Sequence, residues 1–247
     1  MNYGLILAGG KGVRVGALKN KVLLPLNGKP ELHYSIKAFR DAGIFDKIII
    51  VVGEGEHFEV EEVLESLEIK NYSLVTGGKE RQDSVRQGLM EIAKNLQNMD
   101  LKRADSKKEN LENEDIILIH DSARPVVSVE EILSVYNGVK VYKAATVGVP
   151  VKDTIKRADK DGFAIETLPR EELWGISTPQ GFQLNLLQKA YVEAYKDGFY
   201  GTDDCMLVER IKERVKIIEG SYRNIKITTA EDLKIAQAFL ETENWVP

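Results

Sequence analysis

Two short apolar runs without polar interruptions constrain the fold of this chain most strongly. They cover residues 48–52 and 116–119. A strand that is apolar on both faces needs helices on both sides of its sheet, as parallel sheets have. Between such runs lie stretches with apolar residues at helical spacing, for example Val85, Leu89 and Ile92. This alternation predicts an α/β fold with a doubly wound, mostly parallel sheet.

Length and charge narrow the class of protein further. Residues 144–149 and 215–218 add two expected strands, and 247 residues with 43% hydrophobic content suit one domain spanning 1–247. The net charge of -5, without a basic stripe, argues against nucleic acid as a partner. No apolar run reaches the length of a membrane span, and the N-terminus lacks a signal-peptide profile. We therefore expect a cytoplasmic protein that acts on small molecules and has no membrane partner.

Cysteine and histidine usage argues against a metal centre. The single cysteine, Cys205, excludes an intramolecular disulfide and a cysteine-rich metal site, and we expect it in the core or in a helix. The three histidines, His33, His57 and His120, are too scattered to form an obvious cluster. No residue is therefore assigned as a metal ligand.

A short apolar run at residues 5–8 predicts a first strand, which ends in a glycine-rich loop that indicates nucleotide binding. This loop contains Gly9, Gly10, Gly12 and Arg14, and Lys21 follows it. Glycines let a backbone approach phosphates closely. A Walker A loop is excluded because Gly-x-x-x-x-Gly-Lys-Ser/Thr does not occur. A dinucleotide site requires an acidic residue at the end of the second strand, about 20 residues later, where this chain has no strand end.

The remaining interpretation is an enzyme that acts on the α-phosphate of a nucleoside triphosphate. Negative charge builds up on a five-coordinate phosphorus in such a reaction, so fixed cations and backbone N–H groups are the useful catalytic parts. Arg14 and Lys21 are placed for this role. The alternative is that the glycines only form a tight turn and the two cations are solvated.

Polar residues also follow the short run at residues 73–76 and the expected strand at 116–119, at the sheet edge where ligands bind in open parallel sheets. Gly78 permits close backbone approach, and Ser84 is expected either to cap a helix or to contact a base. Asp121 is expected to hold a ribose or polyol hydroxyl or to influence a magnesium ion, and capping of the next turn is its alternative role. His120 is expected to be structural. We therefore expect three loops to converge at one site.

Two segments interrupt the α/β pattern. Residues 95–114 are polar and are expected to form a surface loop or an extended helix end. Residues 151–174 combine strand formers with the turn pair Asp161 and Gly162, which predicts a projecting β-hairpin arm.

The chain resembles the 2-C-methyl-D-erythritol 4-phosphate cytidylyltransferases over nearly its whole length. The motifs that carry the resemblance are residues 8–14, 77–81 with 84–85, 120–125, 150–154, 178–180, 202–204 and 224–228. One departure is visible, because the family usually has Pro-Lys-Gln where this chain has Asn20, Lys21 and Val22.

The resemblance implies a Rossmann-like fold of the nucleotidyltransferase type and a set of site residues. It makes Arg14 and Lys21 the catalytic cations. Substrate-binding roles are expected for Thr154, Arg170, Lys226 and Asp121, and nucleotide-binding roles for Ala8, Gly9, Gly10, Gly12, Gly78 and Ser84.

The implied reaction joins CTP to the phosphate of methylerythritol and releases pyrophosphate. The phosphate of the sugar alcohol attacks the α-phosphorus in line, without a general base, and Mg²⁺ is held mainly by the phosphates of CTP. The arm at 151–174 is expected to cross to a second subunit, which implies a homodimer. Two alternatives stay open, namely a ribitol-5-phosphate cytidylyltransferase and a nucleotide-binding protein without catalytic activity.

Overall fold

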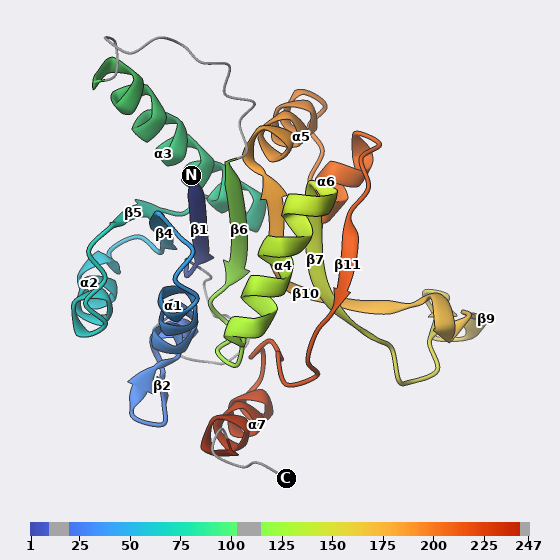
Figure 1. Cartoon of the computed structure of the whole chain (residues 1–247). Coiled ribbons are helices and arrows are strands. Elements are labelled where there is room, and N and C mark those ends of the chain that lie inside the picture. Colours follow the sequence, from blue (N-terminus) through green and yellow to red (C-terminus); the bar gives the residue numbers. More distant parts are fainter. Residues whose placement is uncertain (10–19, 103–114, 243–247) are drawn as a thin grey trace.

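A seven-stranded sheet forms the centre of the computed structural model, which describes residues 1–9, 20–102 and 115–242 (Figure 1). The strand order is β11 (Lys216–Glu219), β7 (Ala144–Pro150), β10 (Trp174–Gln183), β6 (Ile116–Asp121), β1 (Asn2–Leu7), β4 (Lys47–Val52) and β5 (Tyr72–Thr76). Within this sheet β10 runs antiparallel to its neighbours β6 and β7, and the other neighbouring pairs are parallel. The predicted α/β fold with a mostly parallel sheet is therefore confirmed.

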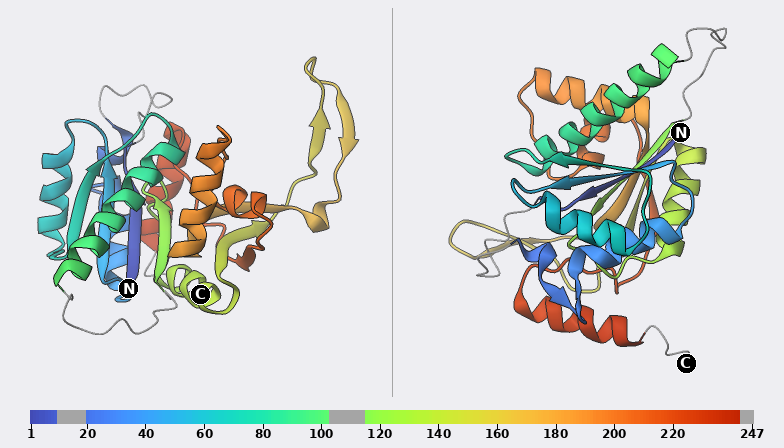
Figure 2. Two further views of the ribbon diagram at one scale, coloured as in Figure 1. Left: turned by 90° about the horizontal axis from the view of Figure 1, so that it is seen from above. Right: turned by 90° about the vertical axis from the view of Figure 1, so that its left-hand side faces the viewer.

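Helices cover both faces of the sheet (Figure 2). One face carries α1 (Glu31–Asp41), α2 (His57–Ser66) and α4 (Val129–Tyr142), and the other carries α3 (Arg81–Lys102), α5 (Leu184–Lys196) and α6 (Asp204–Arg210). The central residues of β4 show how the two layers divide, because Ile50 belongs to the first hydrophobic cluster and Ile49 to the second. Successive side chains of a strand point to opposite faces, so an uninterrupted apolar run fills both cores.

A third, smaller cluster lies beside the sheet. It joins a short hairpin, β2 (Pro25–Leu26) with β3 (Lys29–Pro30), to the C-terminal helix α7 (Ala230–Glu241), which lies beside β2 in Figure 1. Leu26, Ile227 and Ala236 are its buried members that connect these segments. This packing holds the segment that precedes α7, which includes Ile227, next to the carboxyl end of β6.

The arm projects from the sheet, as predicted (Figure 2). Its antiparallel strands are β8 (Lys156–Ala158) and β9 (Ala164–Thr167), followed by the 3-10 turn η3 (Arg170–Glu172). Gly162 adopts a φ of 87° in the turn, a conformation that favours glycine. Phe163 and Ile165 of the arm are 73% and 58% exposed. The arm therefore presents apolar surface.

The polar segment at 95–114 begins as a helix. Residues 95–102 form the end of α3, in agreement with the expected extended helix end, and residues 103–114 lie outside the described part of the chain.

Cys205 is buried in α6, as expected for a residue of the core or of a helix. In the described part of the chain, no helix is long and apolar enough to cross a membrane.

Candidate active site

The loops that follow β1, β5 and β6 begin at one carboxyl edge of the sheet, where the end of β4 links those after β1 and β5. Ser122, directly after β6, donates from both its backbone N–H and its hydroxyl to the carbonyl of Leu7, at 3.0 and 2.7 Å. The N–H of Ala8 donates to the carbonyl of Val51 at 2.7 Å, and Gly77 donates to Val52 at 2.8 Å. The expected convergence of three loops is therefore seen in the structure.

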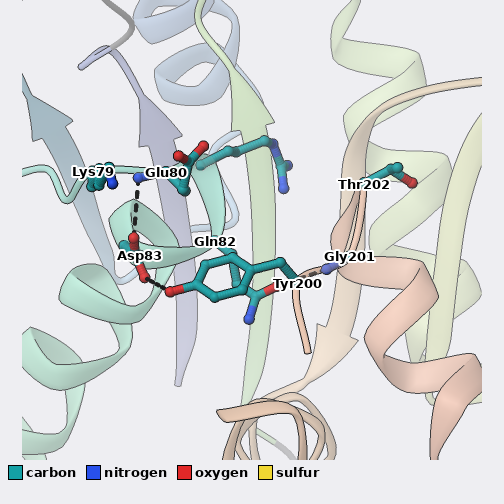
Figure 3. A pocket seen from close by; sticks show the side chains of 8 residues that line it. Lys79, Glu80, Gln82, Asp83, Tyr200, Gly201 and Thr202 are labelled. Atoms are coloured by element: carbon teal, nitrogen blue, oxygen red, sulfur yellow. Dashed lines mark hydrogen bonds between the residues drawn. The ribbon is translucent and has the colours of Figure 1, made fainter. Parts of the chain in front are cut away.

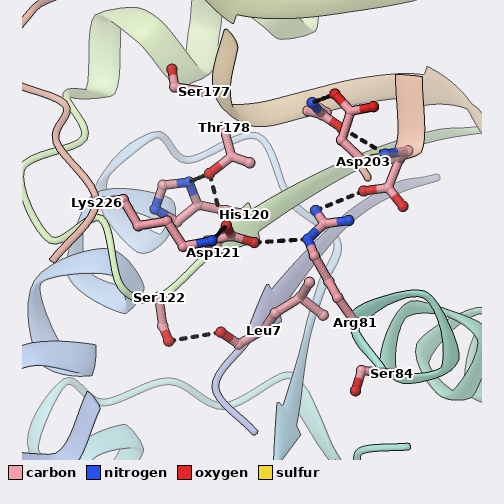
Figure 4. Close-up of polar contacts among 12 residues, drawn as sticks. Leu7, Arg81, Ser84, His120, Asp121, Ser122, Ser177, Thr178, Asp203 and Lys226 are labelled. Carbon is pink, nitrogen blue, oxygen red and sulfur yellow. Dashed lines mark hydrogen bonds and ion pairs between the residues drawn. The ribbon is translucent and has the colours of Figure 1, made fainter. Parts of the chain in front are cut away.

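Asp121 is the charged centre of this edge (Figure 4). The ammonium of Lys226 lies 2.6 Å from one oxygen of its carboxylate, and Nε of Arg81 lies 3.1 Å from the other. Burial favours the neutral form of Asp121, but the two cations outweigh it and hold the pKa of this carboxyl well below its usual range. Asp121 is therefore an anion throughout the physiological pH range.

Arg81 links Asp121 to a second buried carboxylate. Its guanidinium lies 2.8 Å from Asp204, whose side chain is 1% exposed, and the hydroxyl of Tyr191 donates to the same carboxylate at 2.5 Å. Burial opposes the charge of Arg81, but Asp204 and Asp121 raise the pKa of Arg81 above its ordinary value. The side chain of Asp203 caps the N-terminus of α6 by accepting the N–H of Met206, and this fixes the position of Asp204, the first residue of the helix.

His120 is fully buried and neutral. Its Nε2 lies 3.2 Å from the carbonyl oxygen of Arg124, which can only accept, so Nε2 carries the proton. Its Nδ1 is then unprotonated and accepts from the hydroxyl of Thr178 at 2.9 Å, and this hydroxyl also accepts the N–H of Asp121 at 3.1 Å. Burial lowers the pKa of His120 to about 4. These contacts fit the structural role expected for His120.

The segment that carries Lys226 is held against the loop after β6. The N–H of Ile227 donates to the carbonyl of Ala123 at 2.8 Å, and Arg124 donates to the carbonyl of Asn224 at 2.8 Å. The amide of Asn224 donates in turn to the carbonyl of Thr178 at 2.9 Å. This bonding fixes the backbone on both sides of Lys226, so its ammonium is aimed at Asp121.

Gly78 and Ser84 lie together at the start of α3. The hydroxyl of Ser84 accepts the N–H of Gly78 at 3.1 Å and donates to the carbonyl of Glu80 at 3.2 Å. A Cβ at Gly78 would lie 2.3 Å from the Cβ of Asp83, so only glycine permits this close approach. Ser84 thus fixes the loop, and contact with a base stays a prediction.

A pocket of about 600 Å³ lies next to Arg81 (Figure 3). It is lined by residues 79–83 and 200–202. The hydroxyl of Tyr200 donates to the carboxylate of Asp83 at 3.1 Å across this pocket. This contact joins the two segments and so helps to fix the first turn of α3, where Arg81 lies.

Of the predicted nucleotide loop, the structure describes the two ends. Ala8 is buried at the end of β1, and Gly9 follows it. Lys21 begins the 3-10 turn η2 (Lys21–Leu23). The predicted residues Gly10, Gly12 and Arg14 lie outside the described part of the chain.

Thr154 and Arg170 lie away from the other predicted site residues. Both are exposed on the arm, where Arg170 donates to the carbonyl of Lys152 at 2.8 Å. The arm extends sideways from the sheet, beyond β7 and β11 (Figures 1 and 2), whereas Asp121 lies at the end of the central strand β6. One chain therefore does not bring the four predicted substrate-binding residues together.

Arg81 and Asp204 were not predicted as site residues. Both lie in motifs that carry the family resemblance, residues 77–81 and 202–204. Their pairing depends on the approach of α3 to α6, which spacing along the chain does not reveal.

Comparison with known proteins identifies the family. The family model for 2-C-methyl-D-erythritol 4-phosphate cytidylyltransferase matches residues 3–242. A relative of that name from Caldanaerobacter subterraneus subsp. tengcongensis is 44% identical, with 96% of this chain and 97% of the relative covered. One from Clostridium beijerinckii is 43% identical with the same coverage.

Solved structures agree. The crystal structure of 4-diphosphocytidyl-2C-methyl-D-erythritol synthase from Anaerococcus prevotii superposes with a TM-score of 0.78 at 28% identity, covering 97% of this chain and 98% of that one. The 2-C-methyl-D-erythritol 4-phosphate cytidylyltransferase of Thermus thermophilus gives 0.71 at 26% identity, with 98% and 100% covered. This chain belongs to the 2-C-methyl-D-erythritol 4-phosphate cytidylyltransferase family.

Proposed function

We infer that this chain is a cytidylyltransferase that joins CTP and 2-C-methyl-D-erythritol 4-phosphate, forming the CDP derivative and releasing pyrophosphate. The observation that carries this inference is the family match over residues 3–242, which includes the whole central sheet and the Asp121 network. The relatives are named for methylerythritol phosphate, so a ribitol-5-phosphate enzyme is not favoured.

The reaction exchanges one phosphorus–oxygen bond for another. An oxygen of the methylerythritol phosphate forms a bond to the α-phosphorus of CTP, and the bond between the α-phosphorus and the β-phosphate oxygen breaks. A phosphate monoester has a second pKa of about 6, so the nucleophile is largely a dianion near neutral pH. The enzyme therefore has to overcome repulsion between anions and to align them, which fixed cations do.

The nucleotide is proposed to bind at the ends of β1 and β5. Backbone groups of Ala8, Gly9, Gly10 and Gly12 would surround the phosphates, with Arg14 and Lys21 stabilising charge on the α-phosphate. Gly78 and Ser84 are proposed to contact the cytosine. Support for this assignment comes from Ala8 and Gly9, which lie at the carboxyl end of β1, and from Lys21, which begins the turn after the loop.

Lys226 is proposed to bind the phosphate of methylerythritol phosphate. An ammonium has three donors, and Asp121 accepts one of them at 2.6 Å. The pair thus orients Lys226 while leaving donor capacity for a phosphate. Asp121 itself is proposed to accept a hydroxyl of the substrate, which suits a carboxylate that stays ionised.

Mg²⁺ is proposed to enter with CTP, because phosphate oxygens are hard ligands of the kind that it prefers. Bound there, it would offset negative charge on the triphosphate. Asp121 offers a carboxylate at this edge, but both its oxygens already accept from Arg81 and Lys226. We therefore propose no direct bond from this residue to the metal.

A homodimer would complete the site. Thr154 and Arg170 are exposed on the arm, away from Lys226. We propose that the arm of a second subunit brings them to the methylerythritol phosphate, with Arg170 binding its phosphate and Thr154 orienting it. The exposed Phe163 and Ile165 would supply apolar contact area.

A cytoplasmic location is proposed as well, since both substrates are highly charged small molecules.

Pyrophosphate release tests this function. The purified protein receives CTP and Mg²⁺ with methylerythritol phosphate, with ribitol 5-phosphate or with no acceptor. We expect release with the first alone, and the variant Lys21→Ala should lower its rate by roughly a hundredfold to a thousandfold. The exposed Lys29→Ala is the matched control. Preference for ribitol 5-phosphate, or no release with either acceptor, would contradict the inference.

A further inference from the structure

The side chain of Asn20 ties together the two ends of the nucleotide loop. Its amide nitrogen donates to the carbonyl of Ala8 at 2.6 Å and to a carboxylate oxygen of Glu56 at 2.7 Å. Both partners only accept, so the orientation of the amide is fixed and its oxygen faces the N–H of Val22, at 3.4 Å. Asn20 is 8% exposed. A buried amide with both donors used thus joins residue 8 to residue 20.

Glu56 extends this link to the loop after β4. The oxygen that accepts from Asn20 also accepts the N–H of Gly53, at 3.0 Å. A Cβ at Gly53 would lie 2.3 Å from that oxygen, so glycine at this position makes room for the carboxylate. Glu56 directly precedes α2 and is itself half-buried. The amide of Asn20 and the carboxylate of Glu56 together therefore anchor the exit of the nucleotide loop to the ends of β1 and β4.

The same residue begins the turn that carries Lys21. The carbonyl of Asn20 accepts the N–H of Leu23 at 3.1 Å, which closes the 3-10 turn η2 around Lys21. Asn20 therefore fixes the backbone before Lys21 through its side chain and the backbone after it through its carbonyl. This is the position at which the sequence departs from the usual Pro of the family.

We propose that Asn20 and Glu56 are positioning residues for cytidylyl transfer, which hold the base of the nucleotide loop closed and set the place of Lys21. The proposal rests on the proposed function in assigning Lys21 to the α-phosphate. A displacement of about 1 Å at such a group can cost about a hundredfold in rate. Loss of the link should therefore act on turnover and on CTP binding.

The test compares single, double and near-isosteric variants. Asn20→Ala and Glu56→Ala each remove the link, and the double variant removes no further bond of it. Asn20→Asp replaces the donating nitrogen by an oxygen that faces two acceptors, the carbonyl of Ala8 and the carboxylate of Glu56. Glu56→Gln keeps an oxygen that can accept from both Asn20 and the N–H of Gly53, so it should preserve the link. Glu61→Ala, an exposed position of α2, is the matched control.

We expect Asn20→Ala and Glu56→Ala to lower kcat by about 10- to 100-fold and CTP affinity by about tenfold, with the KM for methylerythritol phosphate within about twofold. The double variant should be no worse than the worse single variant, because the two act as one unit. Asn20→Asp should be the most impaired single variant, whereas Glu56→Gln should stay within about threefold of the wild type, because its oxygen can still accept both N–H groups. A role that only fills space would leave Asn20→Asp close to the wild type.

Three results would overturn the proposal: unchanged kcat and CTP affinity in both alanine variants, losses that multiply in the double variant, or an Asn20→Asp variant as active as the wild type. Thermal melting identifies any variant that does not fold, and the near-isosteric variants Asn20→Asp and Glu56→Gln then decide. CTP affinity is measured by calorimetry without the second substrate. A wild-type protein that binds CTP but releases no pyrophosphate would therefore contradict the function alone, while the binding data still test the link.

Discussion

The ammonium of Lys226 lies 2.6 Å from the carboxylate of Asp121, although the two residues are 105 positions apart in the chain. The contact joins the end of β6 to the segment before α7. Asp121 also pairs with Arg81, so a single buried anion holds two cations at the sheet edge. This arrangement places positive charge beside the carboxyl ends of β1 and β6, where anionic substrates are proposed to bind.

Replacing Lys226 should affect the second substrate more than the nucleotide. A hydrogen bond from a charged group to a phosphate contributes roughly 1.5–3 kcal/mol, so Lys226→Ala should lower kcat/KM for methylerythritol phosphate by about 10- to 150-fold. CTP affinity, measured by calorimetry, should change by less than about threefold. The exposed Lys216→Ala on β11 is the control. An equal loss of CTP affinity would assign Lys226 to the nucleotide instead.

Arg81 should matter most for stability. Its removal leaves the carboxylates of Asp121 and Asp204 without their shared cation, so Arg81→Met should lower the free energy of unfolding by about 3 kcal/mol or more. The comparison is Arg210→Met, which breaks a partly exposed pair with Asp197 at the surface and should destabilise the fold much less. Urea denaturation measures both. Equal losses in the two variants would show that the buried network adds no stability.

His120 should make the fold sensitive to mild acid. Its pKa is lowered from 6.5 to about 4 by burial, so the unfolded chain binds a proton more readily than the folded one. The free energy of unfolding should therefore be highest above pH 6.5 and fall as the pH drops toward 4, by about 3 kcal/mol from this residue. Urea denaturation from pH 7 to 4.5 measures the slope, which should be shallower in His120→Gln. Equal slopes would contradict a neutral buried His120.

Completion of the site by a second subunit can be tested by mixing variants. Lys226→Ala impairs the sheet edge and Arg170→Ala impairs the arm, so each homodimer should be nearly inactive. A mixed dimer contains one site with both residues intact. After subunit exchange, an equal mixture should regain about a quarter of wild-type activity. No recovery, in dimers that sedimentation shows to have exchanged, would mean that Arg170 does not act across subunits.

Much of the fold could be predicted because its strands are buried on both faces. The runs at 48–52 and 116–119 match β4 and β6 closely, since an uninterrupted apolar run has few other places in an α/β protein. By contrast, β10 was not predicted. Its sequence contains two glycines and Pro179, which weaken a strand pattern, and its place between β6 and β7 is decided by tertiary pairing.

The site was predictable only in part. The position of Asp121 at a strand end indicated a functional role, and the structure places it at the centre of the ion network. The partners of that network could not be predicted, because Arg81 and Lys226 come from distant segments that meet only in the folded chain. Thr154 and Arg170 were assigned by resemblance alone, and their roles stay predictions.

In the proposed reaction, the phosphate of methylerythritol phosphate attacks the α-phosphorus of CTP. The decisive measurement uses methylerythritol phosphate with ¹⁸O in its non-bridging phosphate oxygens and follows the products by ³¹P NMR and mass spectrometry. We expect a CDP product whose bridging oxygen is ¹⁸O, seen as an isotope shift at both phosphorus atoms, and unlabelled pyrophosphate. Label in the pyrophosphate, or an α-phosphorus without an ¹⁸O neighbour, would contradict it.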